Sequence, residues 1–259
     1  MKPQRTKRVK QSAGGGPLRG RVALVTGGAI RVGRAISLAL AREGCHVAVN
    51  YFTSRGAVTA TVREIRSLGV DAAPIRADLA KPSEAKRLIS DTVSRFGRLD
   101  LLVNNAGIFF RTPLTETTPV QWDRLLDVNL RGPFLCSQAA AEVMLGARGG
   151  RIINIADVAA VRAWPQYIPY CVSKAGLLML TKALALSLAP HIQVNCVAPG
   201  TVLFPEDFPP RLRRRLKREI PMGREGDPDD VAAAVLFFAT APAYITGQVL
   251  FVDGGVTAR

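Results

Sequence analysis

Side chains that hold metals or form disulfides are scarce in this chain of 259 residues. It has four cysteines and two histidines, and the cysteines are scattered without a Cys-x-x-Cys pair. Zinc centres and disulfide frameworks need clustered ligands or paired cysteines. The sequence therefore predicts no metal site. Its isolated cysteines are typical of reduced thiols in a cytoplasmic protein.

Long hydrophobic runs and aromatic residues are also few. No uninterrupted apolar run reaches the roughly 20 residues that a membrane-spanning helix needs, so the sequence predicts a soluble protein that does not engage a membrane. Aromatic residues make up 6% of the chain and do not alternate with the basic runs. A stacking platform for nucleic acid is therefore disfavoured.

Acidic residues are too few to balance the basic ones, and the formal net charge is +15. Residues 1–17 contain several lysines and arginines, no acid and a run of glycines, which predicts a basic, disordered tail. A second basic run, RLRRRLKRE, lies at 211–219. Solvated surface is the simplest interpretation of both segments. Attraction to an anionic substrate, carrier or nucleic acid is the alternative.

The rest of the chain alternates short apolar segments with helical patterns. The apolar segments are continuous, as in strands that are buried on both faces. A sheet with helices on both sides follows from this alternation. We predict an α/β fold with a doubly wound, mostly parallel, seven-stranded sheet in one domain at 18–259. The predicted strands lie near 22–25, 47–49, 73–77, 100–103, 151–155, 193–197 and 249–252.

A glycine-rich turn, TGGAIRVGR at 26–34, joins the first predicted strand to the first predicted helix. Glycines allow a tight turn whose backbone N–H groups reach a pyrophosphate at the helix N-terminus. The pattern predicts a phosphate-binding loop with contacts from Gly27, Arg31 and Val32. Arg31 adds a permanent cation and a planar fork of donors beside the phosphates.

The end of the second predicted strand reads VNYFTSR at 49–55 and contains no acid. An acid at this point usually holds the free ribose 2′-hydroxyl of NAD. Here Asn50 and Tyr51 lead into Ser54 and Arg55, which suit a 2′-phosphate. The sequence therefore predicts NADP(H) as the cofactor. The alternative is that Arg55 only begins a solvated helix.

Residues 151–174 read RIINIADVAAVRAWPQYIPYCVSK. Lys174 follows Tyr170 by one helical turn, on the same face of the helix. A phenol has a pKa near 10, and we expect the lysine cation to lower it toward the operating pH. Asp157 follows an apolar segment shortly before. The set suits a step in which a substrate heteroatom gains a proton after hydride transfer.

In order and spacing these motifs resemble the short-chain dehydrogenase/reductase family. The turn at 26–34 resembles its TGxxxGxG loop, Asn104-Asn105-Ala106-Gly107 its NNAG motif, and Tyr170-x-x-x-Lys174 its YxxxK motif. The resemblance implies a Rossmann-like domain, a small-molecule substrate and a homotetramer packed through the long helices and the last strand. It implies further cofactor contacts at Asp78, Leu79, Asn105, Ala106, Gly107, Pro199 and Gly200.

The same resemblance assigns catalytic roles to three residues. Tyr170 becomes the proton donor, and Lys174 also holds the nicotinamide ribose. Asn129 would hold a water that passes protons to the lysine.

Two positions depart from the common family pattern. Arg31 stands where most members have a glycine, and Asp157 stands where most have a serine. Both features resemble the pteridine reductase branch, in which Phe109 would stack the pterin against the nicotinamide. The substrate residues are then Arg31, Phe109, Asp157 and Tyr170. Trp164 and Tyr167 either line the pocket or pack structurally.

The predicted function is therefore NADPH-dependent reduction of a pterin-like ring. A first alternative is a 3-oxoacyl-acyl-carrier-protein reductase or general carbonyl reductase. In that case Asp157 only orients Tyr170, and the basic run at 211–219 meets an acidic carrier. A second alternative is a binding protein that senses NADP(H) without turnover.

Overall fold

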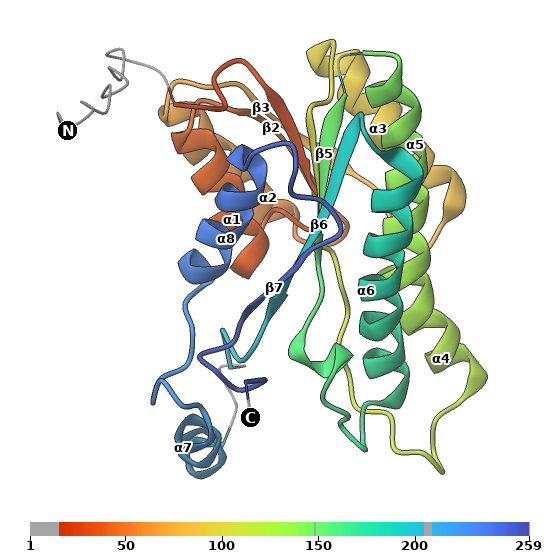
Figure 1. The fold of residues 1–259 in the computed structure, drawn as a ribbon, viewed down its shortest axis with the longest axis vertical. Helices are drawn as coiled ribbons and strands as arrows, with labels where there is room; N and C mark the ends of the chain where they lie inside the picture. The colour runs from red at the N-terminus through yellow and green to blue at the C-terminus, as the bar shows by residue number, and fades with distance from the viewer. Residues whose placement is uncertain (1–15, 148, 205–208, 259) are drawn as a thin grey trace, which may run out of the picture.

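The computed structural model describes residues 16–147, 149–204 and 209–258. The predicted basic tail lies outside this range except for its last two residues. Within it, seven parallel strands form one sheet in the order β3-β2-β1-β4-β5-β6-β7, which confirms the predicted fold class (Figure 1). The strands are β1 (Val22–Val25), β2 (His46–Tyr51), β3 (Ala72–Arg76), β4 (Leu101–Asn104), β5 (Gly150–Ile155), β6 (Ile192–Pro199) and β7 (Val249–Val252).

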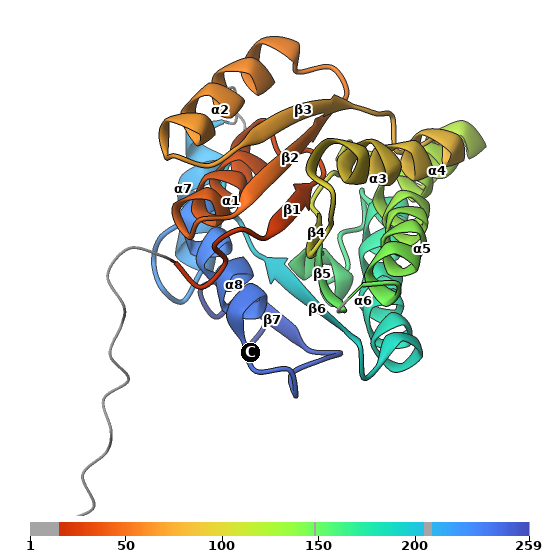
Figure 2. The same ribbon diagram turned by 90° about the horizontal axis from the view of Figure 1, so that it is seen from above.

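Helices cover both faces of this sheet (Figure 2). One layer contains α1 (Arg31–Arg42), α2 (Arg55–Ser67) and α8 (Pro228–Thr240), and the other contains α3 (Pro82–Phe96), α5 (Gly132–Leu145) and α6 (Ile168–Leu188). The central strands β1 and β4 are buried throughout. Their apolar runs are continuous because each face meets a helix layer.

The strand order reverses between β1 and β4. β1 leads outward to β2 and β3, whereas β4 leads the other way to β5, β6 and β7. In open parallel sheets the crevice for a ligand lies at the carboxyl ends of the strands, at this reversal. The predicted phosphate loop after β1 and the NNAG motif after β4 both lie at this point.

The helical segment between β4 and β5 is divided by a wider turn. α4 (Pro119–Leu126) passes into one π-helical turn at Asp127–Arg131, and α5 follows. Single π turns often lie at functional sites. This one holds Asn129, which is fully buried.

Helix α6 is long and apolar enough to cross a membrane by length and composition, with a mean hydropathy of 1.5. Its sequence contains no long uninterrupted apolar run because Lys174 and Lys182 lie within it. The helix buries Tyr170, Ser173, Lys174 and Thr181 on its inner face. That face packs against the sheet, as in the core helix of an α/β domain.

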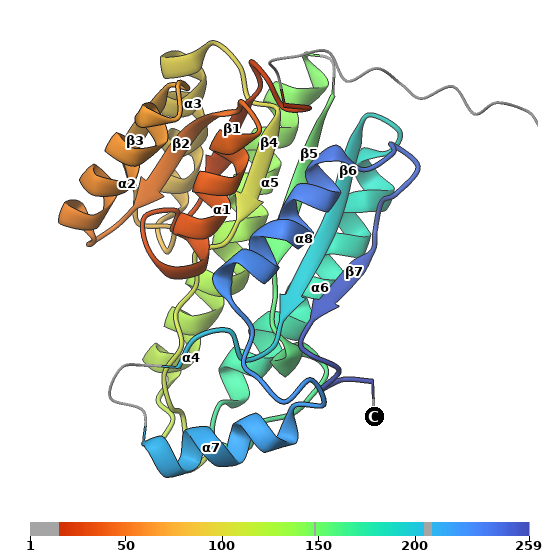
Figure 3. The same ribbon diagram turned by 90° about the vertical axis from the view of Figure 1, so that its left-hand side faces the viewer.

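Helix α7 (Pro210–Glu219) stands apart from both layers. It lies at the end of the molecule toward which the strands point (Figure 3). None of its residues is buried. This helix carries the basic run seen in the sequence.

Candidate active site

The side chains of Asp157 and Tyr170 meet at the carboxyl end of β5. Tyr170 lies in the first turn of α6, and its hydroxyl donates to Oδ2 of Asp157 at 2.8 Å. The other oxygen, Oδ1, accepts from the backbone N–H of Ala159 at 2.8 Å, so Asp157 caps the short 3₁₀ helix Val158–Ala160. The cap fixes the carboxyl group against the phenol.

Lys174 lies one turn along α6 and is almost completely buried. Its Nζ donates to the carbonyl oxygen of Ile155 at 2.9 Å and lies 5.8 Å from the centre of the Tyr170 ring. Burial lowers the pKa of Lys174, and the nearby Asp157 opposes that shift. The lysine is therefore held under the ring and is not hydrogen-bonded to the phenol oxygen.

The electrostatics of Tyr170 correct one expectation. Burial raises the pKa of Tyr170 well above its usual value, and the charge and hydrogen bond of Asp157 raise it further. The sequence predicts instead that Lys174 lowers the pKa of Tyr170. The carboxyl oxygen contacts the phenol directly, whereas the ammonium lies beneath the ring, so the carboxyl group dominates. Burial also raises the pKa of Asp157, against lowering contributions from Ala159, Lys174 and Tyr170.

Asn129 links the π turn to the same site. Its Oδ1 accepts from the N–H of Ile108 at 2.8 Å, and its Nδ2 donates to the carbonyl of Ile108 at 3.0 Å and to Oγ of Ser173 at 3.3 Å. A Cβ on Gly107 would lie 3.4 Å from Asn129 Oδ1 and 3.7 Å from Lys174 Nζ. Asn129 and Lys174 therefore flank Gly107.

Aromatic rings form one wall beside Tyr170. The ring of Phe109 stacks on Tyr167 at 4.5 Å and meets Tyr170 edge-on at 4.8 Å. Trp164 stacks on Tyr170 at 6.2 Å and also meets Phe109 edge-on at 6.1 Å. Phe109 remains 53% exposed. We define Phe109, Trp164, Tyr167 and Tyr170 as the aromatic wall, in which stacked and edge-on rings surround the phenol with apolar surface.

The glycine-rich turn packs tightly against the NNAG segment. Gly27 has a positive φ of 58°, and a Cβ on Gly33 would collide with the carbonyl oxygen of Gly27 and the side chain of Asn105. Asn105 donates to the carbonyls of Thr26 and Gly27 at 2.9 and 3.2 Å. The first turn of α1 contains no acid, so the helix N-terminus is open to an anion.

Comparison with known proteins agrees with this arrangement. Residues 28–257 match the family model described as enoyl-(acyl carrier protein) reductase. The chain belongs to the short-chain dehydrogenase/reductase family. It is 42% identical to the 3-oxoacyl-[acyl-carrier-protein] reductase FabG of Staphylococcus aureus, over 90% of this chain and 97% of that protein.

Two further relatives show the breadth of the likeness. The 3beta-hydroxysteroid dehydrogenase 1 of Eggerthella lenta is 40% identical over 93% of this chain and 95% of that protein. A putative short-chain alcohol dehydrogenase from Sinorhizobium meliloti superposes with a TM-score of 0.89 at 35% identity, covering 93% of this chain and 98% of that one. These names favour the carbonyl reductase alternative over the pterin prediction.

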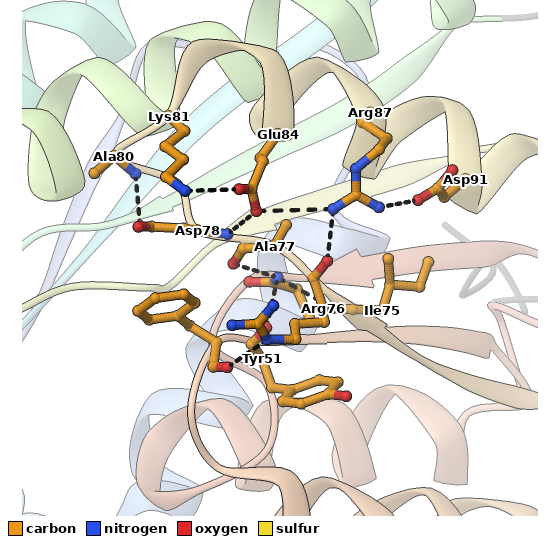
Figure 4. A network of polar contacts seen from close by, with 12 residues as sticks. Tyr51, Ile75, Arg76, Ala77, Asp78, Ala80, Lys81, Glu84, Arg87 and Asp91 are labelled. Atoms are coloured by element: carbon orange, nitrogen blue, oxygen red, sulfur yellow. Dashed lines mark hydrogen bonds and ion pairs between the residues drawn. The ribbon is translucent and has the colours of Figure 1, made fainter.

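In this short-chain oxidoreductase, a polar network surrounds the segment predicted to meet the adenine (Figure 4). The N–H of Asp78 donates to Glu84 at 2.8 Å, and Oδ1 of Asp78 accepts from Ala80 at 3.1 Å. Glu84 in turn pairs with Lys81 at 3.3 Å and Arg87 at 3.8 Å. The network holds Asp78 in place, while the following Leu79 is buried in the core.

The predicted residues at the end of β2 divide into two groups. Asn50 is buried, and its side chain is occupied by the N–H of Gly27 at 3.1 Å and the carbonyls of Ile75 and Ala77 at 3.2 and 3.3 Å. It therefore shapes the phosphate loop. Tyr51 and Ser54 are half-buried and Arg55 is exposed at the start of α2, where a ligand could reach them.

The sequence analysis missed Arg76 as a second cation at this edge. Arg76 is the strand partner of Tyr51. Its guanidinium donates to the carbonyl of Phe52 at 3.3 Å and lies 5.3 Å from the centre of that ring. Only the alignment of β2 with β3 brings the two segments together, so a reading of each strand alone could not find it.

The remaining predicted cofactor residues lie at the centre of the same edge. Ala106 and Gly107 follow β4. Val32, half-buried, lies in the first turn of α1. Arg31 has a φ of +50°, a backbone conformation that favours glycine, and its Nη2 donates to the carbonyl of Leu203 at 3.3 Å. It thereby joins the phosphate loop to the segment after β6.

Thr26 begins the loop motif, and the sequence predicted no role for it. Its Oγ1 donates to the carbonyl of Val103 at 3.3 Å and accepts from the N–H groups of Asn105 and Ala106, each at 2.9 Å. One hydroxyl therefore locks the two loops at the strand reversal to each other.

Proposed function

We propose that this protein is an NADPH-dependent reductase of 3-oxoacyl thioesters. The observation that carries the proposal is the buried set of Tyr170, Lys174 and Asn129 at the strand reversal, in a chain that aligns over almost the whole length of 3-oxoacyl-[acyl-carrier-protein] reductases. Such a set serves to deliver a proton to an oxygen that has just become an alkoxide.

The residues at the strand ends fit a nicotinamide dinucleotide. The close packing of Gly27 and Gly33 leaves room for backbone but not for side chains, as a pyrophosphate loop requires. Asp78 would meet the adenine, Ser54 and Arg55 the 2′-phosphate, and Lys174 the nicotinamide ribose. Bound NADPH would supply the hydride to the carbonyl carbon.

The protein residues would then manage the proton. As the carbonyl carbon gains the hydride, the π electrons of the C=O bond would move onto the oxygen, and the hydroxyl of Tyr170 would donate its proton to that oxygen. The phenolate that results is stabilised by Lys174, which lies 5.8 Å from the ring centre. The aromatic wall excludes water from one side, which strengthens these interactions.

A substrate panel tests the proposed function. NADPH oxidation would be followed with a 3-oxoacyl N-acetylcysteamine thioester and with dihydrobiopterin, for the wild type and Asp157→Ser. We expect the wild type to reduce the thioester and Asp157→Ser to retain that activity. Pterin reduction that Asp157→Ser abolishes, with no thioester reduction, would overturn the proposal.

A pterin is the second candidate because two observations favour it. The half-exposed ring of Phe109 offers a stacking surface, and the carboxyl group of Asp157 could bond ring nitrogens and an amino group. The same substrate panel decides between the two functions.

The cofactor preference gives a separate prediction. Replacing Arg55 with Ala should raise the KM for NADPH about tenfold or more, because a hydrogen bond to a charged group contributes about 1.5–3 kcal/mol. The KM for NADH should change little. Arg63→Ala, an exposed arginine on the same helix, is the matched control. Equal effects of Arg55→Ala on both cofactors would contradict a 2′-phosphate contact.

We propose further that the protein is a cytoplasmic homotetramer. All four cysteines are free thiols, which suits a reducing compartment. A groove of about 560 Å³ between α4, α5 and α6 is lined with apolar side chains such as Phe134 and Met179. A second copy packed through these long helices would cover it.

A further inference from the structure

The outer face of α7 carries a stripe of exposed arginines. Arg211, Arg214 and Arg218 are spaced by three and four residues, so they lie on one side of the helix, and all three are exposed. At 1.5 Å per residue the stripe extends over about 10 Å. We use the name arginine stripe for these three residues.

Two acids that the structure describes near α7, Glu219 and Glu225, are paired with other cations. Glu225 pairs with Arg213 and with Lys217, the latter at 3.2 Å. Glu219 pairs with Arg215 at 3.4 Å. In the part of the chain that the structure describes, no ion pair includes a member of the stripe. Its charge is therefore directed outward and uncompensated there.

The helix that carries the stripe lies at the same end of the molecule as the candidate active site. α7 follows the segment after β6, and Arg31 in the phosphate loop bonds the carbonyl of Leu203 in that segment at 3.3 Å. The helix lies beyond the carboxyl ends of the strands (Figure 3). A macromolecule bound to the stripe would therefore stand beside the entrance used by the substrate.

We propose that the arginine stripe docks an acidic carrier protein that presents the acyl thioester to Tyr170. This inference rests on the proposed function and adds the surface that the carrier would contact. An acidic helix with carboxylates at similar spacing would match the stripe. Opposed surface charges of this kind speed association and weaken with salt.

Other polyanions fit the observations less well. α7 contains no aromatic residue, so it offers no stacking for nucleic-acid bases. Its apolar residues are Leu212 and Leu216 alone, and Leu216 is half-buried against the protein. An interfacial membrane helix needs a broad apolar face. A charged helix that has neither aromatic residues nor a broad apolar face favours an acidic protein as the partner.

The experiment compares one acyl group on three carriers. The same 3-oxoacyl group would be attached as a thioester to an acyl carrier protein, to coenzyme A and to N-acetylcysteamine, which is uncharged. The KM and kcat of each would be measured at low and high salt for the wild type and Arg214→Glu/Arg218→Glu. The control Arg42→Glu/Arg63→Glu reverses two exposed arginines on other helices, with the same change in net charge.

We expect the α7 variant to raise the KM of the carrier-linked substrate about 10- to 100-fold with kcat unchanged. The N-acetylcysteamine substrate should stay within about twofold, and the control variant should resemble the wild type. The salt dependence of the carrier KM should also be lost. Circular dichroism would confirm that the variants fold.

Several outcomes would overturn the inference. An equal rise in KM for the coenzyme A thioester would mean that the stripe binds a small phosphate-bearing thioester. No change in the carrier KM would exclude docking at α7. Binding of labelled acyl-free carrier, followed by fluorescence anisotropy, is independent of turnover. A duplex oligonucleotide that binds more tightly than this carrier would assign the stripe to nucleic acid.

The same data separate this inference from the proposed function. If the wild type does not reduce the N-acetylcysteamine thioester, the proposed function fails, whatever the stripe binds. If that thioester is reduced and the α7 variant binds carrier as well as the wild type does, only the docking inference fails.

Discussion

Replacing Tyr170 with Phe should lower kcat/KM for carbonyl reduction about 100- to 10,000-fold, the range that a positioned proton donor contributes. The hydroxyl is the only part of the residue that the substitution removes, so the ring contacts with Phe109 and Trp164 remain. Binding of NADPH, followed by quenching of protein fluorescence, should change little. The measurement is initial-rate NADPH oxidation with the thioester.

Tyr167 offers a matched control in the same aromatic wall. It stacks on Phe109 at 4.5 Å, and the described part of the chain gives its hydroxyl no hydrogen bond to another residue. Tyr167→Phe should therefore keep kcat/KM within about threefold. A Tyr170→Phe enzyme with more than a tenth of wild-type activity would remove Tyr170 as the donor. A cellular function that survives Tyr170→Phe would favour the NADP(H)-sensing alternative.

The direction of the Tyr170 pKa shift has a consequence for the reaction direction. A phenol whose pKa is raised stays protonated at neutral pH, which is the form that reduction needs. Oxidation of an alcohol needs the phenolate, and Asp157 disfavours that form. We therefore expect the proposed reduction to keep its rate at neutral pH, whereas oxidation of an alcohol should require higher pH.

Much of the fold could be predicted because one physical signal repeats through the chain. Continuous apolar strands such as Val22–Val25 require cover on both faces, and helices between them allow only a parallel sheet. Seven parallel strands confirm this. The π turn around Asn129 was not predicted. Asn129 in that turn bonds the backbone of Ile108, 21 positions away in the sequence, and local patterns do not reveal such a contact.

The candidate site was less predictable where geometry decides the outcome. Tyr170 and Lys174 could be placed together because one helical turn separates them. The net effect of the neighbouring charges on the pKa of Tyr170 could not be predicted, because it depends on which atom of Tyr170 each neighbour approaches. Asp157 contacts the oxygen and Lys174 lies under the ring. Asn50 likewise is a residue type that often contacts ligands, but its side-chain amide is occupied by backbone groups of two other segments, the phosphate loop and the end of β3.

We expect Asp157 to lower kcat/KM at alkaline pH, and we expect Asp157→Ser to remove this fall. The protonated carboxyl group can donate a hydrogen bond to the substrate oxygen, whereas the carboxylate would repel the alkoxide that forms there. Burial raises the pKa of Asp157, so the protonated form persists to higher pH than in an exposed aspartate. For the wild type, kcat/KM should fall as pH rises through the apparent pKa of the Asp157–Tyr170 pair.

Substitutions of Asp157 separate the effect of its charge from the effect of its hydrogen bonding. Asp157→Ser and Asp157→Asn keep a donor without the charge, so their profiles should stay level where the wild type falls, about tenfold for each pH unit above the apparent pKa. Asp157→Ala has no donor and should be slower at every pH. A wild-type profile that matches the Asp157→Ser profile between pH 6 and 9 would show that Asp157 does not titrate in catalysis.

Thermal unfolding tests the same carboxyl group without any substrate. A carboxyl whose pKa is raised by folding binds more protons in the folded state, so the free energy of unfolding falls as pH rises from its unfolded pKa of about 3.9 through its folded pKa. Asp157→Asn removes that fall, so the gain in Tm relative to wild type should be larger at pH 8 than at pH 4. Glu116→Gln, at an exposed carboxyl group, should show no such difference. A Tm gain that is the same at both pH values would mean that Asp157 packs differently from Asn but does not carry a raised pKa.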